Sequence, residues 1–510
     1  TALAAFQFGY DSSYYSGKHR KVIWRLSGTD LAFMSIGILA MQPFLKIYGT
    51  FEPLKKVYVM SAAHQSLTSS IINAGEFVGA VSSYYVIDKL GRRGGLFVSS
   101  GTVVVGTIIQ VASTHIGSLI AGRLVLGYAV GLISCVVPTY VADCAPARFR
   151  GALVSMYQYC IGLGLLLGVI VDYCTKDRTD TGSFRIPIAV QFVFPLILIP
   201  GLLFWIPESP RWLISKGRAS EARVALIRLN GNNQEKVDRE MIDLEQFAVE
   251  NERGGPSSWL DLLKWGPEGR KAWLGFSLQA LQQATGINFV TGYGIVFFFA
   301  VGIENPFLIQ LGLYLVAMPA VWFSQFAIER YGRRPILLAS GILTATVLII
   351  MGSCGLIANK TKPVEQVIVV MVYLFLIVFN LGWGPTVWVV TSEISTGKNR
   401  GKLMSLSTGS NWAFNWLVSF TFPYLFNSDG ANLGARIGFL YGCLTLFAVV
   451  WVFFYLPETS GRSLEEIETM FQEHVSVKHF KSYVVPLPSQ EMSLEHDRKT
   501  ATATQIEVVP

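Results

Sequence analysis

Apolar segments of membrane-spanning length recur along the whole chain and restrict the folds it can adopt. Each has roughly 20 residues, the length a helix needs to cross about 30 Å of hydrocarbon. Only 15% of the 510 residues are charged, whereas a soluble chain carries about 25%, and the mean hydropathy is +0.44. The sequence therefore predicts an all-α membrane protein with 12 transmembrane helices. Beyond a first one near the N-terminus, they are expected at residues 66–87, 94–113, 119–142, 152–172, 186–206, 272–301, 307–328, 335–357, 366–391, 403–426 and 436–456.

Basic residues gather in alternate loops between these segments. They occur at 89–93, 148–150, 207–271, 330–334, 398–402 and 462, whereas the loops 173–185, 302–306, 358–365 and 427–435 carry fewer net positive charges. An excess of Lys and Arg marks the cytoplasmic side of a membrane protein, so both termini are predicted to be cytoplasmic. The formal net charge of +7 thus reflects membrane topology and gives no indication of nucleic-acid binding.

The first apolar stretch, residues 1–15, is followed by a basic insert. Residues 18–25 contain four Lys or Arg on the predicted outer side, which opposes the positive-inside rule. One interpretation is an outer loop between two short helices. The other is that residues 18–37 are an aberrant insert from a retained intron, because removing these 20 residues joins Gly17 to Ile38 in one uninterrupted helix. Because the sequence opens on Thr1, N-terminal residues are expected to be missing.

The chain contains an internal repeat. DKLGRR at 88–93 recurs as ERYGRR at 329–334, and both the acid–Arg–Gly set around 143–151 and the Pro-Glu pair at 207–208 recur 250 positions later. Paired halves are typical of transporters that rock one half against the other. The predicted organisation is a six-helix half at 1–206, a cytoplasmic helical linker at 207–269, a second half at 270–456, a cytoplasmic segment at 457–474 and a disordered tail at 475–510. Within the linker, amphipathic patterns cover 218–230 and 235–252.

The charged residues of the repeated motifs are expected to form a gate at the cytoplasmic helix ends. An exposed ion pair contributes at most about 1 kcal/mol, but a network can bias a two-state equilibrium by a few times that amount. The alternative is that these charges only set orientation, and the recurring acids, which orientation does not need, favour the gate. The predicted gating residues are Asp88, Arg92, Arg93, Asp143, Arg150, Glu208, Arg211, Glu329, Arg333, Arg334, Glu393, Arg400 and Glu458.

The QQATGIN motif at 282–288 places three amide side chains inside a predicted membrane span. Such groups are costly at membrane depth unless they find partners or line a wet cavity. Neutral amides both donate and accept hydrogen bonds, so they suit a ligand covered in hydroxyl groups. The alternative is that they join neighbouring helices. Gly286 lets a second backbone or a ligand approach closely.

These motifs together resemble those of sugar porters of the major facilitator superfamily, specifically fungal hexose transporters. The resemblance spans nearly the whole chain and is carried by FGYD (8–11), DKLGRR, AGR (121–123), Arg150-Gly151, PESPRWL (207–213), QQATGIN, ERYGRR, GPTVW (384–388), NW (411–412) and PETSGRSLEEI (457–467). It implies a sugar bound halfway through the membrane between the halves. The residues implied to bind the sugar are Gln158, Gln282, Gln283, Asn288, Trp388, Asn411 and Trp412, although Trp388 could also serve only as interface packing.

The same resemblance bears on energy coupling and on the outer gate. Asp11 and Arg123 match a proton-coupling pair of related symporters, but facilitative carriers keep the aspartate too, so uniport stays open. Ala317 stands where many relatives carry an asparagine, and one of two adjacent tyrosines after TGIN is Gly292 here, which leaves Tyr293 to serve the outer gate.

The function that the resemblance implies is alternating-access transport of a monosaccharide, glucose or a related hexose or pentose, across the plasma membrane, with proton-coupled uptake favoured. The alternatives are a facilitative uniporter, a transporter-like glucose sensor, and a quinate or disaccharide carrier. A tail of about 40 residues favours transport over sensing, because the sensors carry long tails. An enzyme is not expected, since metal-ligand clusters, nucleophile motifs and phosphate loops are missing from the sequence. The expected partners are the sugar, H+ and the lipid bilayer, without cofactor, metal or nucleic acid, and the oligomeric state stays open.

Overall fold

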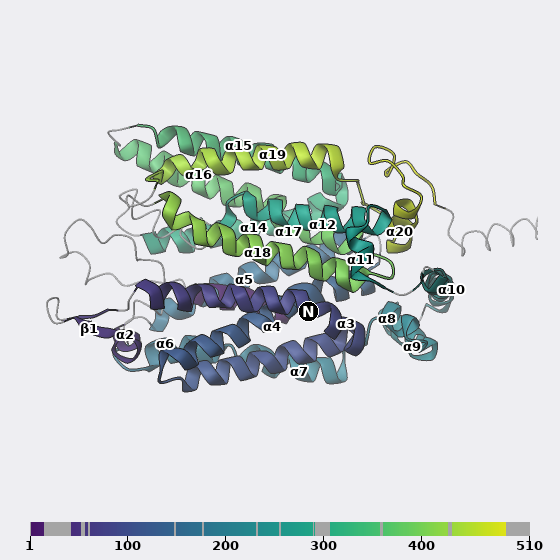
Figure 1. Cartoon of the computed structure of the whole chain (residues 1–510), viewed down its shortest axis with the longest axis horizontal. Coiled ribbons are helices and arrows are strands. Elements are labelled where there is room, and N and C mark those ends of the chain that lie inside the picture. The colour runs from purple at the N-terminus through teal and green to yellow at the C-terminus, as the bar shows by residue number, and fades with distance from the viewer. Residues whose placement is uncertain are drawn as a thin grey trace, which may run out of the picture.

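The structure is a computed structural model that describes residues 2–14, 42–52, 57–59, 62–146, 149–175, 178–230, 233–253, 255, 257–288, 290, 306–357, 361–426 and 431–485. In this part of the chain the long helices run side by side along one axis (Figure 1). They are α1 (Ala2–Tyr14), α3 (Ala62–Ala112), α4 (Ile116–Cys144), α5 (Arg150–Thr175), α6 (Gly182–Val190), α7 (Val193–Phe204), α12 (Pro267–Ala284), α14 (Pro306–Tyr331), α15 (Arg333–Cys354), α16 (Lys362–Leu381), α17 (Trp383–Ile394), α18 (Arg400–Phe426) and α19 (Ile437–Tyr455).

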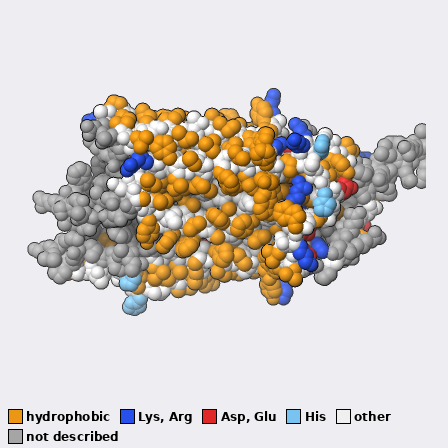
Figure 2. Space-filling model, turned by 45° about the horizontal axis from the view of Figure 1, so that its top comes forward, with side chains coloured by type: hydrophobic (Ala, Val, Ile, Leu, Met, Phe, Trp, Pro, Cys, Tyr) orange, Lys and Arg blue, Asp and Glu red, His pale blue; other side chains and the backbone are white. Residues whose placement is uncertain are grey.

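The outside of this bundle is apolar. A belt of hydrophobic side chains covers the middle of the molecule, and Lys and Arg gather at one end (Figure 2). Leu196, Phe204 and Phe323 are 74%, 72% and 63% exposed, which is unfavourable in water and favourable in lipid. Among the described residues, eight stretches are long and apolar enough to cross a membrane, and Ser70–Ala112, with 43 residues, has the length of two spans. The protein is therefore a multi-pass membrane protein.

Two glycines mark equivalent turns in the first and second parts of the bundle. Gly91 interrupts α3 with φ 78°, between the predicted spans 66–87 and 94–113. Gly332, with φ 93°, separates α14 from α15. A side chain is strained at these angles, and an added Cβ would lie 2.3 Å from Glu208 at Gly91 and 2.6 Å from Glu458 at Gly332. The internal repeat thus has a structural counterpart at both positions.

Two predicted spans are interrupted in the structure. Residues 272–301 were expected to form one helix, but α12 ends at Ala284, and Gly286 has φ +84°, where an added Cβ would lie 2.6 Å from the ring of Tyr441. The span 186–206 holds, because Gln191 and Phe192 keep helical angles between α6 and α7 and the two helices form one apolar stretch, Gly182–Phe204. The span 366–391 is interrupted at Gly382, between α16 and α17. At Gly382 a Cβ would meet the Ser340 hydroxyl at 1.9 Å, so close packing requires glycine there.

Short elements lie at the two ends of the bundle (Figure 1). At one end are α8 (Pro210–Ser215), α9 (Ala219–Leu229), α10 (Gln234–Arg253), α11 (Trp259–Leu263) and α20 (Leu464–Gln472). We call this the linker end, and α9 and α10 form where the amphipathic patterns predict them. At the opposite end lie α2 (Gln42–Tyr48) and an antiparallel pair that was not predicted, β1 (Thr50–Glu52) with β2 (Val57–Val59). The 3-10 helix η4 (Gly434–Arg436) precedes α19.

The packed chain extends beyond the predicted boundary at residue 474. Phe480 is fully buried and its ring lies 5.3 Å from that of Phe471. Arg462 donates hydrogen bonds to the backbone carbonyls of residues 480, 481 and 483. Disorder beginning at residue 475 was therefore wrong for 475–485. The insert at 18–37, Tyr293 and residues 486–510 lie outside the described residues, as does the side chain of Asp11.

Candidate functional site

The amides of the QQATGIN motif lie where α12 ends. Gln282 and Gln283 belong to its last turn, and Thr285 and Gly286 close the turn by donating to the backbone carbonyls of residues 281–283. Both amides are buried. Because the helix stops here, Asn288 does not follow the direction that a continuous helix would give it. Its side chain instead donates to Gln283 Oε1 at 2.9 Å.

Gln282 is held by protein groups. Its Nε2 donates to the carbonyls of Trp383 at 2.9 Å and Gly384 at 3.0 Å, at the beginning of α17. Its Oε1 accepts from Asn411 Nδ2 of α18 at 2.9 Å. Gln282 and Asn411 therefore join α12, α17 and α18, the role that the alternative interpretation gave to such amides. Gln282 Oε1 accepts one hydrogen bond and can accept a second, and Asn411 bonds through Nδ2 and keeps its Oδ1 for a further donor.

Gln279 extends this amide cluster and was missed in the sequence. Its Oε1 accepts from Asn411 at 2.7 Å, and its Nε2 donates to Thr391 Oγ1 of α17 at 3.1 Å. Gln279 precedes Gln282 by three positions and Gln283 by four, so it shares their helix face. That spacing was the signal that could have found it.

Two amides keep polar atoms uncommitted among the described residues. Gln158, half-buried on α5, makes no hydrogen bond to another described side chain or carbonyl. Gln283 accepts from Asn288, and its Nε2 has no described acceptor. Buried amides without partners are unfavourable, so these groups are suited to receive hydroxyls from a ligand.

Two buried tryptophans place this cluster between the first and second parts of the bundle. Trp388 of α17 is 4% exposed and meets Tyr157 of α5 edge to face, with ring centroids 5.3 Å apart. Trp412 of α18 is also 4% exposed, and its Nε1 donates to Ser134 Oγ of α4 at 3.1 Å. Ala317, the residue that departs from the family pattern, is buried in an apolar cluster.

The proposed proton-coupling pair is only half described. Arg123 lies on α4 and is 2% exposed. Asp11 belongs to α1, which packs against α4 and α5, but its side chain is outside the described residues. The pairing of Asp11 with Arg123 stays a prediction.

At the linker end, Asp143 is the centre of one set of ion pairs. Its carboxylate lies 2.8 Å from Arg92 Nε of α3 and 2.7 Å from Arg400 Nη2 of α18, and it accepts from the Ser209 hydroxyl at 2.9 Å. Arg92 and Asp143 belong to the same part of the bundle, whereas Arg400 comes from the other. The Asp143 side chain is fully buried, so its carboxylate is a shared counter-charge for both guanidinium groups away from water.

The second part of the bundle repeats this arrangement around Arg333. It lies 2.8 Å from Glu393 and 3.2 Å from Glu329. In the first half, Glu208 accepts the backbone N–H groups of Arg92 and Arg93. In the second half, Glu458 accepts those of Arg333 and Arg334. Carboxylates at such helix N-termini are stabilised by the unpaired N–H groups and the helix dipole.

Further contacts cross between the two parts of the bundle at the linker end. Glu329 Oε1 accepts from the backbone N–H of Ala152 at 2.8 Å, and Arg150 Nη1 donates to the carbonyl of Arg462 at 3.0 Å. Arg211 of α8 forms an ion pair with Glu465 of α20. Together with Arg400–Asp143, these contacts join the two parts of the bundle at the linker end.

The remaining predicted gating residues lie at the edge of this network. Asp88 pairs with Lys216 at 3.2 Å and is 72% exposed at its side chain. Arg93 donates to the carbonyls of Leu202 and Leu203, and Arg334 donates in the same way to that of Phe453. The structure therefore brings the predicted charges to one end of the molecule, although Asp88, Arg93 and Arg334 do not bridge the two parts.

Lys271 and Glu468 form a buried pair that the sequence did not reveal. Lys271 is 1% exposed and lies 2.6 Å from Glu468 of α20 and 2.5 Å from Glu268. Burial alone would raise the pKa of Glu468, but Lys271 and the hydroxyl of Thr396 outweigh it and hold that pKa below its usual value. The pair fastens α20 beneath α12.

Glu468→Gln is expected to destabilise the protein by about 3 kcal/mol, because Lys271 would keep only one buried carboxylate partner. A carboxyl whose folded pKa is lowered stabilises the fold above its unfolded pKa and loses that contribution as the pH falls through the folded value. The difference between wild type and variant should therefore be full at pH 7 and shrink below the usual Glu pKa of 4.5. Thermal unfolding of both proteins in detergent, at pH 7 and at a pH below 4.5, measures this difference in stability. Glu235→Gln, in an exposed pair on α10, is the control, and an equal loss in both variants would contradict the assignment.

Comparison with known proteins accounts for this arrangement. A family model described as "Sugar (and other) transporter" matches residues 1–471. The chain belongs to this family. The major facilitator-type transporter ecdD of Aspergillus rugulosus is 36% identical over 464 residues, which cover 88% of this chain and 85% of ecdD. The probable glucose transporter rco-3 of Neurospora crassa is 33% identical over 473 residues, which cover 89% of this chain and 79% of rco-3.

Solved structures show the same fold. The proton:xylose symporter XylE of E. coli, bound to 6-bromo-6-deoxy-D-glucose, superposes with a TM-score of 0.78 at 22% identity, covering 92% of this chain and 97% of XylE. The chain is thus a sugar transporter of the major facilitator superfamily, with the fold of 12 helices in two halves that the sequence predicted. This is a family of transporters and not of enzymes.

Proposed function

We propose that this transporter carries a monosaccharide, glucose or a related hexose or pentose, across the plasma membrane by alternating access, with uptake coupled to protons. The observation that carries the proposal is the cluster of amides and indoles between the two halves. Gln158 and Gln283 offer uncommitted polar atoms, and the buried Trp388 and Trp412 contact Tyr157 and Ser134 of the first half. A sugar needs polar contacts at its hydroxyl edge and an apolar surface for its C–H face.

The division of labour among these residues follows from their bonds. Gln282 and Asn411 are held by one another and by backbone carbonyls, so they position the cluster and offer the sugar their remaining acceptor capacity. Gln158, Gln283 and Asn288 supply direct hydrogen bonds. Trp388 and Trp412 supply the apolar surface, and Tyr293 the outer gate.

Alternating access requires a closed end that can open. We assign the linker end to the cytoplasm, with both termini there, because the Lys and Arg excess lies on that side. Asp143, Arg333 and the residues bound to them then form the cytoplasmic gate. Rocking of the halves breaks Arg400–Asp143 and exposes the sugar to the cytoplasm.

Proton coupling is proposed through Asp11 and Arg123. A carboxylate near a buried arginine can exchange its partner for a proton, which links protonation to closure of the site. The names of two similar proteins support sugar transport with or without coupling, since rco-3 is described as a probable glucose transporter and XylE as a proton:xylose symporter.

Uptake of labelled glucose in a cell without its own hexose carriers tests the proposal. We expect accumulation that falls by about tenfold or more when a protonophore removes the gradient, since each pH unit of gradient contributes 1.36 kcal/mol. Asp11→Asn should abolish accumulation while leaving downhill exchange. Uptake that does not change with the protonophore would identify a uniporter. Uptake of quinate or of a disaccharide but not of a monosaccharide would contradict the proposed substrate. Absence of transport for every sugar would favour a sensor.

The same assay examines residues 18–37. We expect uptake from the chain without this insert and little from the chain with it, because the insert separates Gly17 from Ile38 and so interrupts the helix that they would otherwise continue. Equal uptake from both would contradict the retained-intron hypothesis.

A further inference from the structure

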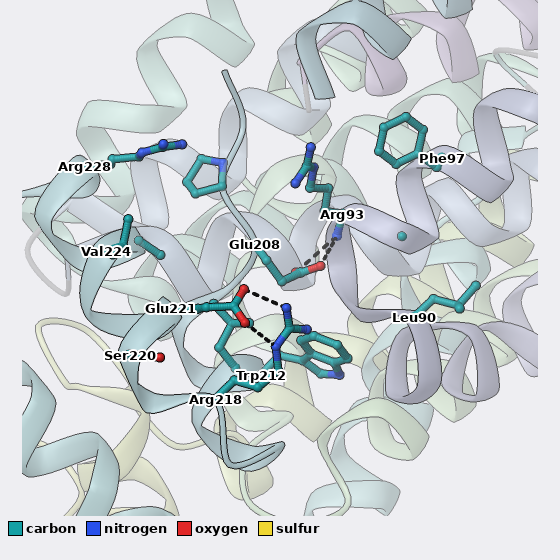
Figure 3. A pocket seen from close by; sticks show the side chains of 14 residues that line it. Leu90, Arg93, Phe97, Glu208, Trp212, Arg218, Ser220, Glu221, Val224 and Arg228 are labelled. Carbon is teal, nitrogen blue, oxygen red and sulfur yellow. Dashed lines mark hydrogen bonds and ion pairs between the residues drawn. The ribbon is translucent and has the colours of Figure 1, made fainter. Parts of the chain in front are cut away.

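A pocket of about 530 Å³ lies at the linker end, away from the amide cluster (Figure 3). Its walls come from the middle of α3, the segment before α8, α8 itself and the linker helix α9. Arg93, Phe97, Glu208, Arg218, Val224 and Arg228 are among the lining residues. This volume lies within the range of small-molecule sites, about 300–1,000 Å³, and the proposed sugar contacts lie elsewhere.

The pocket has two positive charges that no carboxylate neutralises. Of its two acids, Glu208 accepts the backbone N–H groups of Arg92 and Arg93, and Glu221 binds Arg218 through two hydrogen bonds of 2.7 and 2.6 Å. Arg228 is exposed and has no hydrogen bond or ion pair with another described residue.

Arg93 supplies the second charge. It donates only to the neutral carbonyls of Leu202 and Leu203, at 2.7 and 3.1 Å, so its guanidinium stays available to an anion. Figure 3 shows Arg93 and Arg228 on one side of the pocket and the Arg218–Glu221 pair on the other. Guanidinium groups from α3 and α9 that line one pocket suit a phosphate, whose oxygens accept N–H donors.

The surroundings of the pocket are those of a membrane surface. Arg93 donates to carbonyls in the last turn of α7. Phe204, the last residue of that helix, and the following Trp205 are 72% and 76% exposed. Exposed aromatic residues of this kind mark the boundary between hydrocarbon and headgroups. Leu90 and Val224, both at the pocket, are 52% and 53% exposed. Cations and exposed apolar side chains therefore lie together at this pocket.

We propose that this pocket binds the phosphate headgroup of an anionic phospholipid, with the acyl chains lying along the exposed apolar residues beside it. A soluble phosphate compound would use the same two arginines but would leave Leu90, Phe204 and Val224 without a partner. The bound lipid would connect α3 of the first half to α9 of the linker. This inference is independent of which sugar is carried.

Native mass spectrometry of the full chain in neutral detergent, titrated with phosphatidylglycerol or phosphatidylcholine, tests the proposal. A basic residue near an anionic lipid surface contributes about 1 kcal/mol, or about fivefold in affinity. We expect phosphatidylglycerol to bind the wild type more tightly than phosphatidylcholine, Arg228→Gln to weaken it about fivefold, and Arg228→Lys to restore most of the loss.

The matched control is Arg239→Gln, which removes an exposed arginine of α10 outside the pocket and should leave phosphatidylglycerol binding unchanged. Equal weakening by both variants would show a diffuse charge effect and overturn the site. Unchanged binding by Arg228→Gln, or equal affinity for the two lipids, would also overturn it. Displacement of phosphatidylglycerol by millimolar inorganic phosphate would show that the pocket binds a soluble anion, and would overturn the lipid assignment.

Discussion

Asp143→Asn is expected to shift the transporter towards a state that is open at the linker end. The variant keeps the shape of the side chain but leaves Arg92 and Arg400, each within 2.8 Å of the carboxylate, without their counter-charge. Removing one partner of a buried ion pair costs about 3–5 kcal/mol. Because the Arg400 contact joins the two halves, much of that cost falls on the closed state. A shift of about 2 kcal/mol changes the ratio of the two states roughly thirtyfold.

The distance between spin labels at Lys89 and Tyr331, which lie on different halves at the linker end and are exposed, reports this shift. A longer distance should become the main population in Asp143→Asn, provided that the exposed Cys174 and Cys443 are replaced. Asp180→Asn is the matched control, because its pair with Arg178 is exposed and contributes at most about 1 kcal/mol. An unchanged distance distribution in Asp143→Asn would show that the closed end does not depend on this carboxylate.

The helical framework and the repeat could be predicted because both are written in local patterns. Spans follow from runs of apolar residues, and Gly91 and Gly332 each lie before an Arg pair in the repeated motif. The same motif predicted charges at one end of the helices, and in the structure Asp143 and Arg333 form ion pairs at the linker end.

Other features depend on tertiary contacts that a pattern does not contain. The end of α12 is set by Gly286 fitting against Tyr441, 155 residues later, inside a run that reads as continuously apolar. The pairing of Lys271 with Glu468 joins residues 197 positions apart. For the same reason Gln282 could be assigned to the site from its motif, but its hydrogen bonds to α17 could not be predicted.

The second large effect is expected from replacing Gln282, Gln283 and Trp388 together by alanine. Gln283 offers an uncommitted donor, Gln282 holds the amide cluster, and Trp388 fills the space against Tyr157. A site built to hydrogen-bond hydroxyls loses about 1–3 kcal/mol for each buried polar contact removed. Loss of all three should reduce sugar transport by at least about a hundredfold.

Uptake of labelled glucose into vesicles that contain equal amounts of purified protein is the most direct measurement of the central claim. The matched control carries Gln110→Ala and Trp265→Ala, a buried amide between α3 and α4 and an 84%-exposed indole, both outside the amide cluster. The account predicts that the control transports glucose near the wild-type rate and that the triple variant is nearly inactive with the same amount of folded protein. Undiminished glucose transport by the triple variant would contradict a sugar site made of these amides and indoles.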